Sequence, residues 1–263
     1  MSQRKAIGID LGTTFSVVAH IDPYGKPQVI PNTENERITP SVILFENDAA
    51  IVGTLAKNHA VAEPERIVDF VKREMGKPKD HFHREFDGSV YSAEELSSLI
   101  LRKLKNDAEK FLQQPVTDAV ITVPAYFNDA ERIATLTAGQ LAGLNVLQVI
   151  NEPTAAAVAY GLDKLGQDQT VFVFDLGGGT FDVTIMRIEG HQIRMLATNG
   201  DHRLGGKDWD DVLVNYVAEE FDRGAAAAGE LNLGRQRAAL QVLITLQVEQ
   251  RISPCSRSNS SAT

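Results

Sequence analysis

Two short segments, far apart in the chain, combine aspartate, glycine and threonine in nearly the same order. They read DLGTTF at residues 10–15 and DLGGGTF at residues 175–181. Glycines in a tight turn lack a Cβ, so backbone N–H groups can close around an anion, while threonine hydroxyls donate further hydrogen bonds. Aspartate supplies oxygen ligands for a hard cation such as Mg²⁺. The two segments therefore predict contacts to a polyphosphate and Mg²⁺.

Each segment is a predicted turn between two β-strands. Apolar, β-favouring residues flank the first turn at 6–9 and 16–19, and the second turn at 171–174 and 183–186. A third strand is expected after each pair. One such turn alone would be weak evidence, because most glycine turns after strands are structural. The duplicated pattern instead predicts two related lobes that offer their turns to one ligand, and nucleotide is the natural ligand for such a pair.

Strands and helices alternate between the two turns. Ser92 with Glu95 three residues later predicts the start of a helix. Further elements are expected as a strand at 119–123, a helix at 129–142, a strand at 146–150 and a helix at 154–160. This alternation is typical of an α/β fold with parallel strand pairs. Residues 39–91 contain prolines and many charges, and are interpreted as a subdomain inserted into the first lobe. Towards the end of the chain we expect helices after Asp208 and at 233–250, and a disordered tail at 251–263.

Composition excludes several classes of function. The 263 residues carry a formal net charge of −9, which argues against a general nucleic-acid-binding protein. Cys255 is the only cysteine, so an intramolecular disulfide and a cysteine-based metal site are both excluded. The sequence shows no long apolar run of the kind that enters a membrane. We interpret it as a cytoplasmic protein with no membrane or nucleic-acid partner.

Five stretches resemble the nucleotide-binding domain of the Hsp70 (DnaK-type) molecular chaperones. They are residues 7–14, 123–130, 151–157, 175–183 and 204–206. The resemblance covers residues from about 5 to 222. It implies an actin-like ATPase fold, in which two ribonuclease-H-like lobes enclose Mg-ATP. Lobe I would span 1–168, with the inserted subdomain at about 39–91, and a partial lobe II would span 169–250.

The resemblance also implies which residues handle ATP or ADP and Mg²⁺. Lys72 would help to place the attacking water and neutralise phosphate charge. The implied catalytic residues are Lys72, Glu152, Asp175 and Thr180, the nucleotide-binding residues are Gly12, Thr13, Thr14, Phe15, Gly177, Gly178, Gly179, Thr180, Gly205 and Gly206, and the metal-site residues are Asp10, Asp175 and Asp182. No histidine is assigned a role.

The function implied by the resemblance is that of an ATPase-domain fragment of an Hsp70-like chaperone. In the family, ATP hydrolysis drives protein folding, and J-domain co-chaperones and nucleotide-exchange factors are the partners. The part of the family domain that completes the second lobe and the adenine pocket is not found in this sequence, nor is a peptide-binding domain, so hydrolysis by this chain is left open. A non-catalytic interaction protein is one alternative. A sugar kinase or an actin-like filament protein is another, because both share the paired phosphate turns.

Overall fold

The computed structural model describes residues 5–47, 49–161, 168–190 and 192–228. The chain divides into two compact units, residues 1–206 and 207–263. The helix expected at 233–250 and the tail expected at 251–263 lie outside the described residues. Both predicted turns belong to the first unit.

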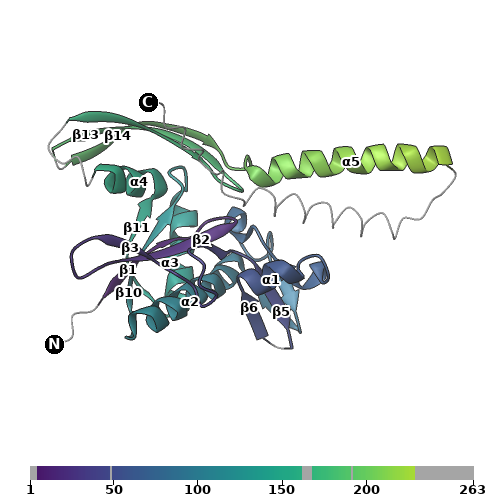
Figure 1. The fold of residues 1–263 in the computed structure, drawn as a ribbon, viewed down its shortest axis with the longest axis horizontal. Helices are drawn as coiled ribbons and strands as arrows, with labels where there is room; N and C mark the ends of the chain where they lie inside the picture. The colour runs from purple at the N-terminus through teal and green to yellow at the C-terminus, as the bar shows by residue number, and fades with distance from the viewer. Residues whose placement is uncertain (1–4, 48, 162–167, 191, 229–263) are drawn as a thin grey trace, which may run out of the picture. The chain divides into compact units, whose positions relative to one another are not determined.

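A mixed sheet forms the centre of the first unit (Figure 1). Its strands are β1 (Ala6–Asp10), β2 (Phe15–Ile21), β3 (Pro27–Ile30), β4 (Thr39–Pro40), β10 (Asp118–Val123) and β11 (Asn145–Asn151). The strand order is β11-β10-β1-β2-β3, with β4 paired to β2. The pairs β1–β10 and β10–β11 are parallel, whereas β1–β2 and β2–β3 are antiparallel. This mixed sheet confirms the predicted α/β class.

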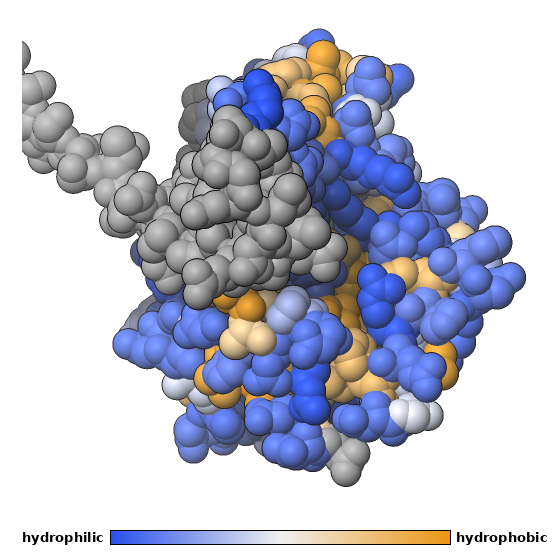
Figure 2. Space-filling view, turned by 90° about the vertical axis from the view of Figure 1, so that its right-hand side faces the viewer, coloured by the Kyte–Doolittle hydropathy of each residue, from blue (hydrophilic) through white to orange (hydrophobic). Residues whose placement is uncertain are grey.

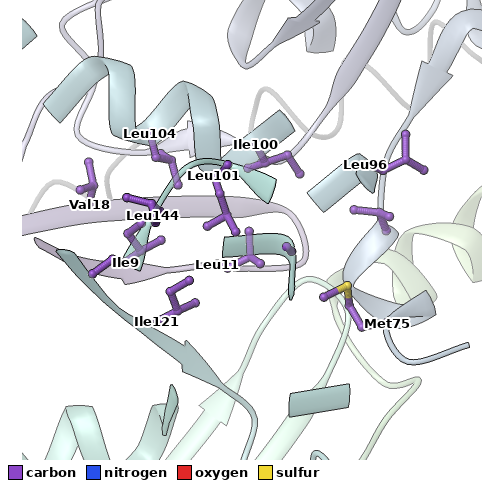
Figure 3. Packing of buried hydrophobic residues seen from close by; sticks show 14 of the residues in the cluster. Ile9, Leu11, Val18, Met75, Leu96, Ile100, Leu101, Leu104, Ile121 and Leu144 are labelled. Atoms are coloured by element: carbon purple, nitrogen blue, oxygen red, sulfur yellow. The ribbon is translucent and has the colours of Figure 1, made fainter. Parts of the chain in front are cut away.

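Alternating burial along the central strands directs apolar side chains towards two helices. Ile7 and Ile9 of β1 are buried, whereas Ala6, Gly8 and Asp10 are exposed. The helices α2 (Ala93–Leu112) and α3 (Asp129–Leu141) pack against each other and against this sheet. Figure 3 shows Ile9, Val18 and Ile121 of the sheet beside Leu101 and Leu104 of α2, all of them members of one core cluster. This core gives the strand ends of the sheet a fixed position.

Both helices begin at the capping residues that their sequences favour. The Ser92 side chain accepts a hydrogen bond from the Glu95 N–H, and the Glu95 carboxylate accepts one from the Ser92 N–H at 2.7 Å. Asn128 and Glu131 form the same reciprocal pair at the start of α3. Satisfying these terminal N–H groups defines where each helix starts. The predicted helix starts at Ser92 and near residue 129 are therefore confirmed.

The segment between β4 and α2 forms a small layer of short elements. They are β5 (Ile43–Glu46), β6 (Ala49–Val52), α1 (Thr54–His59), η1 (Pro64–Arg66), β7 (Ile67–Val68), η2 (Val71–Glu74), β8 (Arg84–Phe86) and β9 (Ser89–Tyr91). The Phe45 and Phe86 rings stack with centroids 4.1 Å apart and join its two small sheets. The one-turn helix η2 carries Lys72 and Arg73, so this layer contributes directly to the candidate site.

A second sheet repeats the antiparallel three-strand pattern of β1, β2 and β3. It consists of β12 (Gln169–Leu176), β13 (Phe181–Glu189) and β14 (Gln192–Asp201) in that order. The helix α4 (Glu152–Gly161) contacts strands of both sheets. Thr184 and Met186 of β13 are each 1 % exposed, whereas Phe172 and Phe174 of β12 are 61 % and 60 % exposed. One face of this sheet is therefore covered and carries the polar site residues, while the other presents aromatic side chains.

The remaining described element is α5 (Gly206–Ala228), almost all of which belongs to the second unit. Its apolar residues Val212 and Tyr216 lie four positions apart and are exposed.

The face of the protein in Figure 2 is mainly hydrophilic, with apolar residues in small groups. Within the part of the chain that the structure describes, no helix is both long enough and apolar enough to cross a membrane.

Candidate functional site

Hydrogen bonds hold both predicted turns in place. In the first, Gly12 donates its N–H to the Ser16 hydroxyl at 3.2 Å and accepts a hydrogen bond from the Ser41 hydroxyl at 2.8 Å. In the second, the Gly177 N–H donates to the Thr180 carbonyl at 3.0 Å. A Cβ at Gly12 would lie 2.0 Å from the Phe15 carbonyl oxygen, so a side chain cannot be accommodated there. Both turns are therefore present where the sequence predicted them.

The two turns meet in the folded chain. A Cβ at Gly178 would lie 2.3 Å from Cγ2 of Thr14, and one at Gly179 would lie 2.3 Å from Cγ2 of Thr13. The glycines of the second turn thus touch the threonines of the first turn directly. This close approach brings together backbone N–H groups and hydroxyls from two separate sheets, as a polyphosphate site requires.

Gly205 and Gly206 pack directly against the backbone of the second turn. The Gly206 N–H donates to the Gly177 carbonyl at 3.0 Å. A Cβ at Gly205 would lie 2.4 Å from the backbone nitrogen of Gly179 and 2.5 Å from the carbonyl carbon of Gly178. The structure therefore places both predicted glycines at the turn. Phe15 lies at the start of β2, where Lys57 Nζ is 4.9 Å from its ring centroid, so its side chain meets a lysine of α1.

We expect Gly205→Ala to lower the free energy of unfolding by about 1–3 kcal/mol, because its new methyl group meets backbone that must move. Chemical denaturation of the two proteins measures this difference. Gly8→Ala is the matched control, since a Cβ at Gly8 would meet nothing within 4 Å. Equal midpoints for Gly205→Ala and the unsubstituted chain would contradict the close approach.

A buried ion pair lies beside the turns. Lys72 of η2 is 6 % exposed, and its Nζ is 2.5 Å from Oε1 of Glu152, the first residue of α4. Burial raises the pKa of Glu152, and repulsion from Asp10 and Asp175 raises it further, whereas the charge of Lys72 opposes both. The predicted catalytic residues Lys72 and Glu152 are thus in direct contact although they are distant in sequence.

Three aspartates surround this pair. Asp10 accepts a hydrogen bond from the Thr122 hydroxyl at 2.9 Å, and Asp175 and Asp182 are register partners on β12 and β13. Burial raises the pKa of Asp175, and repulsion from Asp10 adds to this effect. Burial, with repulsion from Glu152 and Asp175, raises the pKa of Asp182 to about 6. The cluster therefore carries more negative charge than the neighbouring Lys72 balances.

A hydrated divalent cation fits this cluster. The Oδ1 atom of Asp182 is buried and has no hydrogen-bond partner among the described residues. In the same part of the chain, no three His, Cys, Asp or Glu side chains are close enough to ligate a metal ion together. Mg²⁺ keeps several of its waters and binds through few carboxylates and substrate phosphates. Asp10, Asp175 and Asp182 would therefore hold the ion largely through water.

Two residues near the site were not assigned a role from the sequence. The Nε of Arg73 donates a hydrogen bond to the Gly179 carbonyl at 2.8 Å. The ring centroids of Tyr126 and His202 are 3.7 Å apart. Burial raises the pKa of the Tyr126 hydroxyl, and the negative charges of Asp182 and Glu152 raise it further. The sequence held one signal for each residue. Arg73 follows Lys72 directly, and Tyr126 lies within a stretch that resembles the family.

Comparison with known proteins finds relatives that all belong to one family. A family model described as Hsp70 protein matches residues 6–253. A chaperone protein DnaK from Thermus thermophilus is 49% identical over 259 residues, covering 91% of this chain and 41% of the relative. A chaperone protein DnaK from Thermotoga maritima is 49% identical over 246 residues, covering 92% of this chain and 40% of the relative. The chain thus spans about 40% of the length of these curated relatives.

Proposed function

The chain belongs to the Hsp70 family, and from this premise we propose that it binds ATP and ADP together with Mg²⁺ as a nucleotide-binding domain. The observation that carries the proposal is the meeting of the two turns, in which Gly178 and Gly179 touch Thr14 and Thr13. Backbone N–H groups and hydroxyls of two turns that face each other can hold one polyphosphate from both sides. The unbalanced aspartates supply the cation site that such an anion needs.

We also propose that the site hydrolyses ATP, with the protein acting mainly by positioning. Lys72 is fixed by Glu152, so its ammonium group can orient an attacking water and balance charge on the terminal phosphate. The Thr180 hydroxyl and the glycine N–H groups hold the phosphates. The bound Mg²⁺ would supply charge neutralisation. The bond from the terminal phosphorus to the bridging oxygen breaks as the water oxygen forms its bond to phosphorus; ADP leaves with the bridging oxygen, and the protons of the water go to the released phosphate and to solvent.

From the family relationship alone we propose J-domain co-chaperones and nucleotide-exchange factors as partners, and protein folding as the process served. A non-catalytic interaction protein is the second candidate. The exposed Phe172 and Phe174 favour it, because aromatic residues on a sheet face are typical of protein contacts. A sugar kinase or an actin-like filament protein has no observation in its favour beyond the paired turns.

Calorimetric titration with ATP, with and without Mg²⁺, tests the proposal after circular dichroism has shown that the chain is folded. We expect saturable binding that depends on Mg²⁺ and that weakens in Asp175→Asn. Asp87→Asn is the matched control, because Asp87 is an exposed turn residue with φ of 48° and asparagine tolerates that conformation. A folded chain that binds no ATP would favour the non-catalytic candidate.

A further inference from the structure

The short helix η2 carries two neighbouring cationic side chains that contact different elements. In η2, Lys72 contacts Glu152 at the start of α4, whereas the Nε of the next residue, Arg73, contacts the carbonyl of Gly179 at 2.8 Å. Gly179 lies in the turn between β12 and β13. Arg73 therefore links the inserted layer of the first sheet to the glycine turn of the second, across 106 residues of sequence.

The base from which Arg73 projects is held firmly. Val71 and Met75 are each 3 % exposed, and the Ser97 hydroxyl donates to the Met75 sulfur at 3.2 Å. Phe70, the residue before η2, has φ of 52° and ψ of 20°, a left-handed conformation that is costly for a bulky side chain. The Arg73 guanidinium carbon lies 5.9 Å from the Phe70 ring centroid. These contacts limit where the guanidinium group can reach.

The acceptor is equally restricted. A Cβ at Gly179 would lie 3.0 Å from the Arg73 Nε and 2.3 Å from Cγ2 of Thr13, so the absence of a side chain permits both contacts. A carbonyl and the following N–H share one peptide plane and point in opposite directions. The hydrogen bond from Arg73 to the Gly179 carbonyl therefore also orients the N–H of Thr180.

We propose that Arg73 is a positioning residue that holds the Gly177–Thr180 turn against Thr13 and Thr14 before nucleotide binds. We call the hydrogen bond from Arg73 to the Gly179 carbonyl the latch. This inference rests on the proposed function, since it assigns the latch a role in phosphate binding. A turn that is already ordered loses less conformational entropy when it grips the phosphates. Arg73 thereby tightens the binding of Mg-ADP and slows the release of Mg-ADP. It does so indirectly, because the Arg73 Nε donates its hydrogen bond to the protein backbone.

Hydrogen–deuterium exchange of the nucleotide-free chain tests the latch independently of ligand binding. We expect Arg73→Met to speed exchange in the segment 177–182 about 10-fold, in line with the loss of one hydrogen bond from a charged donor. Arg73→Lys keeps the charge but places a methylene group where Nε stood. Exchange in the segment 177–182 should therefore be as fast as in Arg73→Met. Arg66→Met is the matched control, because Arg66 is a half-exposed arginine of the same layer whose ion pair with Glu63 is long, at 3.7 Å.

Stopped-flow release of fluorescent ADP in the presence of Mg²⁺ tests the consequence, with about 10-fold faster release expected for Arg73→Met and Arg73→Lys. Unchanged exchange in 177–182, equal acceleration throughout α2, or full restoration by Arg73→Lys would overturn the latch. Faster exchange with unchanged release would overturn its role in nucleotide binding. If the unsubstituted chain binds no ADP, the proposed function and the phosphate-binding role fail together, and the exchange experiment still decides whether the latch itself exists.

Discussion

Replacing Lys72 by methionine is expected to lower the free energy of unfolding by about 3 kcal/mol and any ATP hydrolysis by about 100-fold or more. The physical reason is that Glu152 remains buried without the ammonium group that is 2.5 Å away in the unsubstituted chain. Methionine keeps most of the lysine stem, so packing around η2 is largely preserved. Chemical denaturation gives the first quantity, and single-turnover hydrolysis with Mg-ATP gives the second.

A double-mutant cycle with Glu152→Gln isolates the pair. Each single change leaves one buried polar or charged group without its partner, whereas the double variant removes both charges. The double variant should therefore be more stable than the sum of the two single effects predicts, by about 1–3 kcal/mol. Additive effects, or a Lys72→Met variant that unfolds and hydrolyses ATP like the unsubstituted chain, would show that the pair is neither structural nor catalytic.

The parts of this fold that sequence predicted well are those whose causes are local. The turn at Gly12 needs glycine for the chain to close, and Ser92 and Asn128 satisfy N–H groups three residues away. The helix predicted at 154–160 is longer in the structure and begins at Glu152. Proline is tolerated in the first turn of a helix, so Pro153 does not delay its start.

The parts that sequence could not predict depend on long-range approach. Without the family resemblance, Lys72 would have been interpreted as a surface lysine, because nothing nearby in sequence reveals its contact with Glu152. The hydrogen bond from Arg73 to Gly179 and the ring contact between Tyr126 and His202 likewise join segments that meet only after both sheets have formed. The predicted boundary between lobes near residue 168 stays a prediction, as do the individual roles of the site residues.

Asp182→Asn is expected to stabilise the ligand-free chain at pH 7 by about 1–2 kcal/mol, with no gain below about pH 4. The pKa of Asp182 is raised from 3.8 to about 6 by burial and by repulsion from Glu152 and Asp175. A carboxyl group whose pKa is raised on folding binds protons more tightly in the folded state. Its favourable contribution is therefore complete below about pH 4 and is lost as the pH rises through about 6. Denaturant unfolding at a series of pH values measures this profile.

The same argument predicts how Mg²⁺ and ATP change the result. Because we propose that the ionised Asp182 attracts the cation, we expect Mg-ATP to stabilise the unsubstituted chain more than Asp182→Asn, and this advantage should shrink below about pH 6 as protons compete. Asp87→Asn, which changes an exposed carboxylate, should follow the unsubstituted chain at every pH. Parallel pH profiles for Asp182→Asn and the unsubstituted chain would contradict the raised pKa of Asp182. The proposed cation site would then involve Asp10 and Asp175 alone.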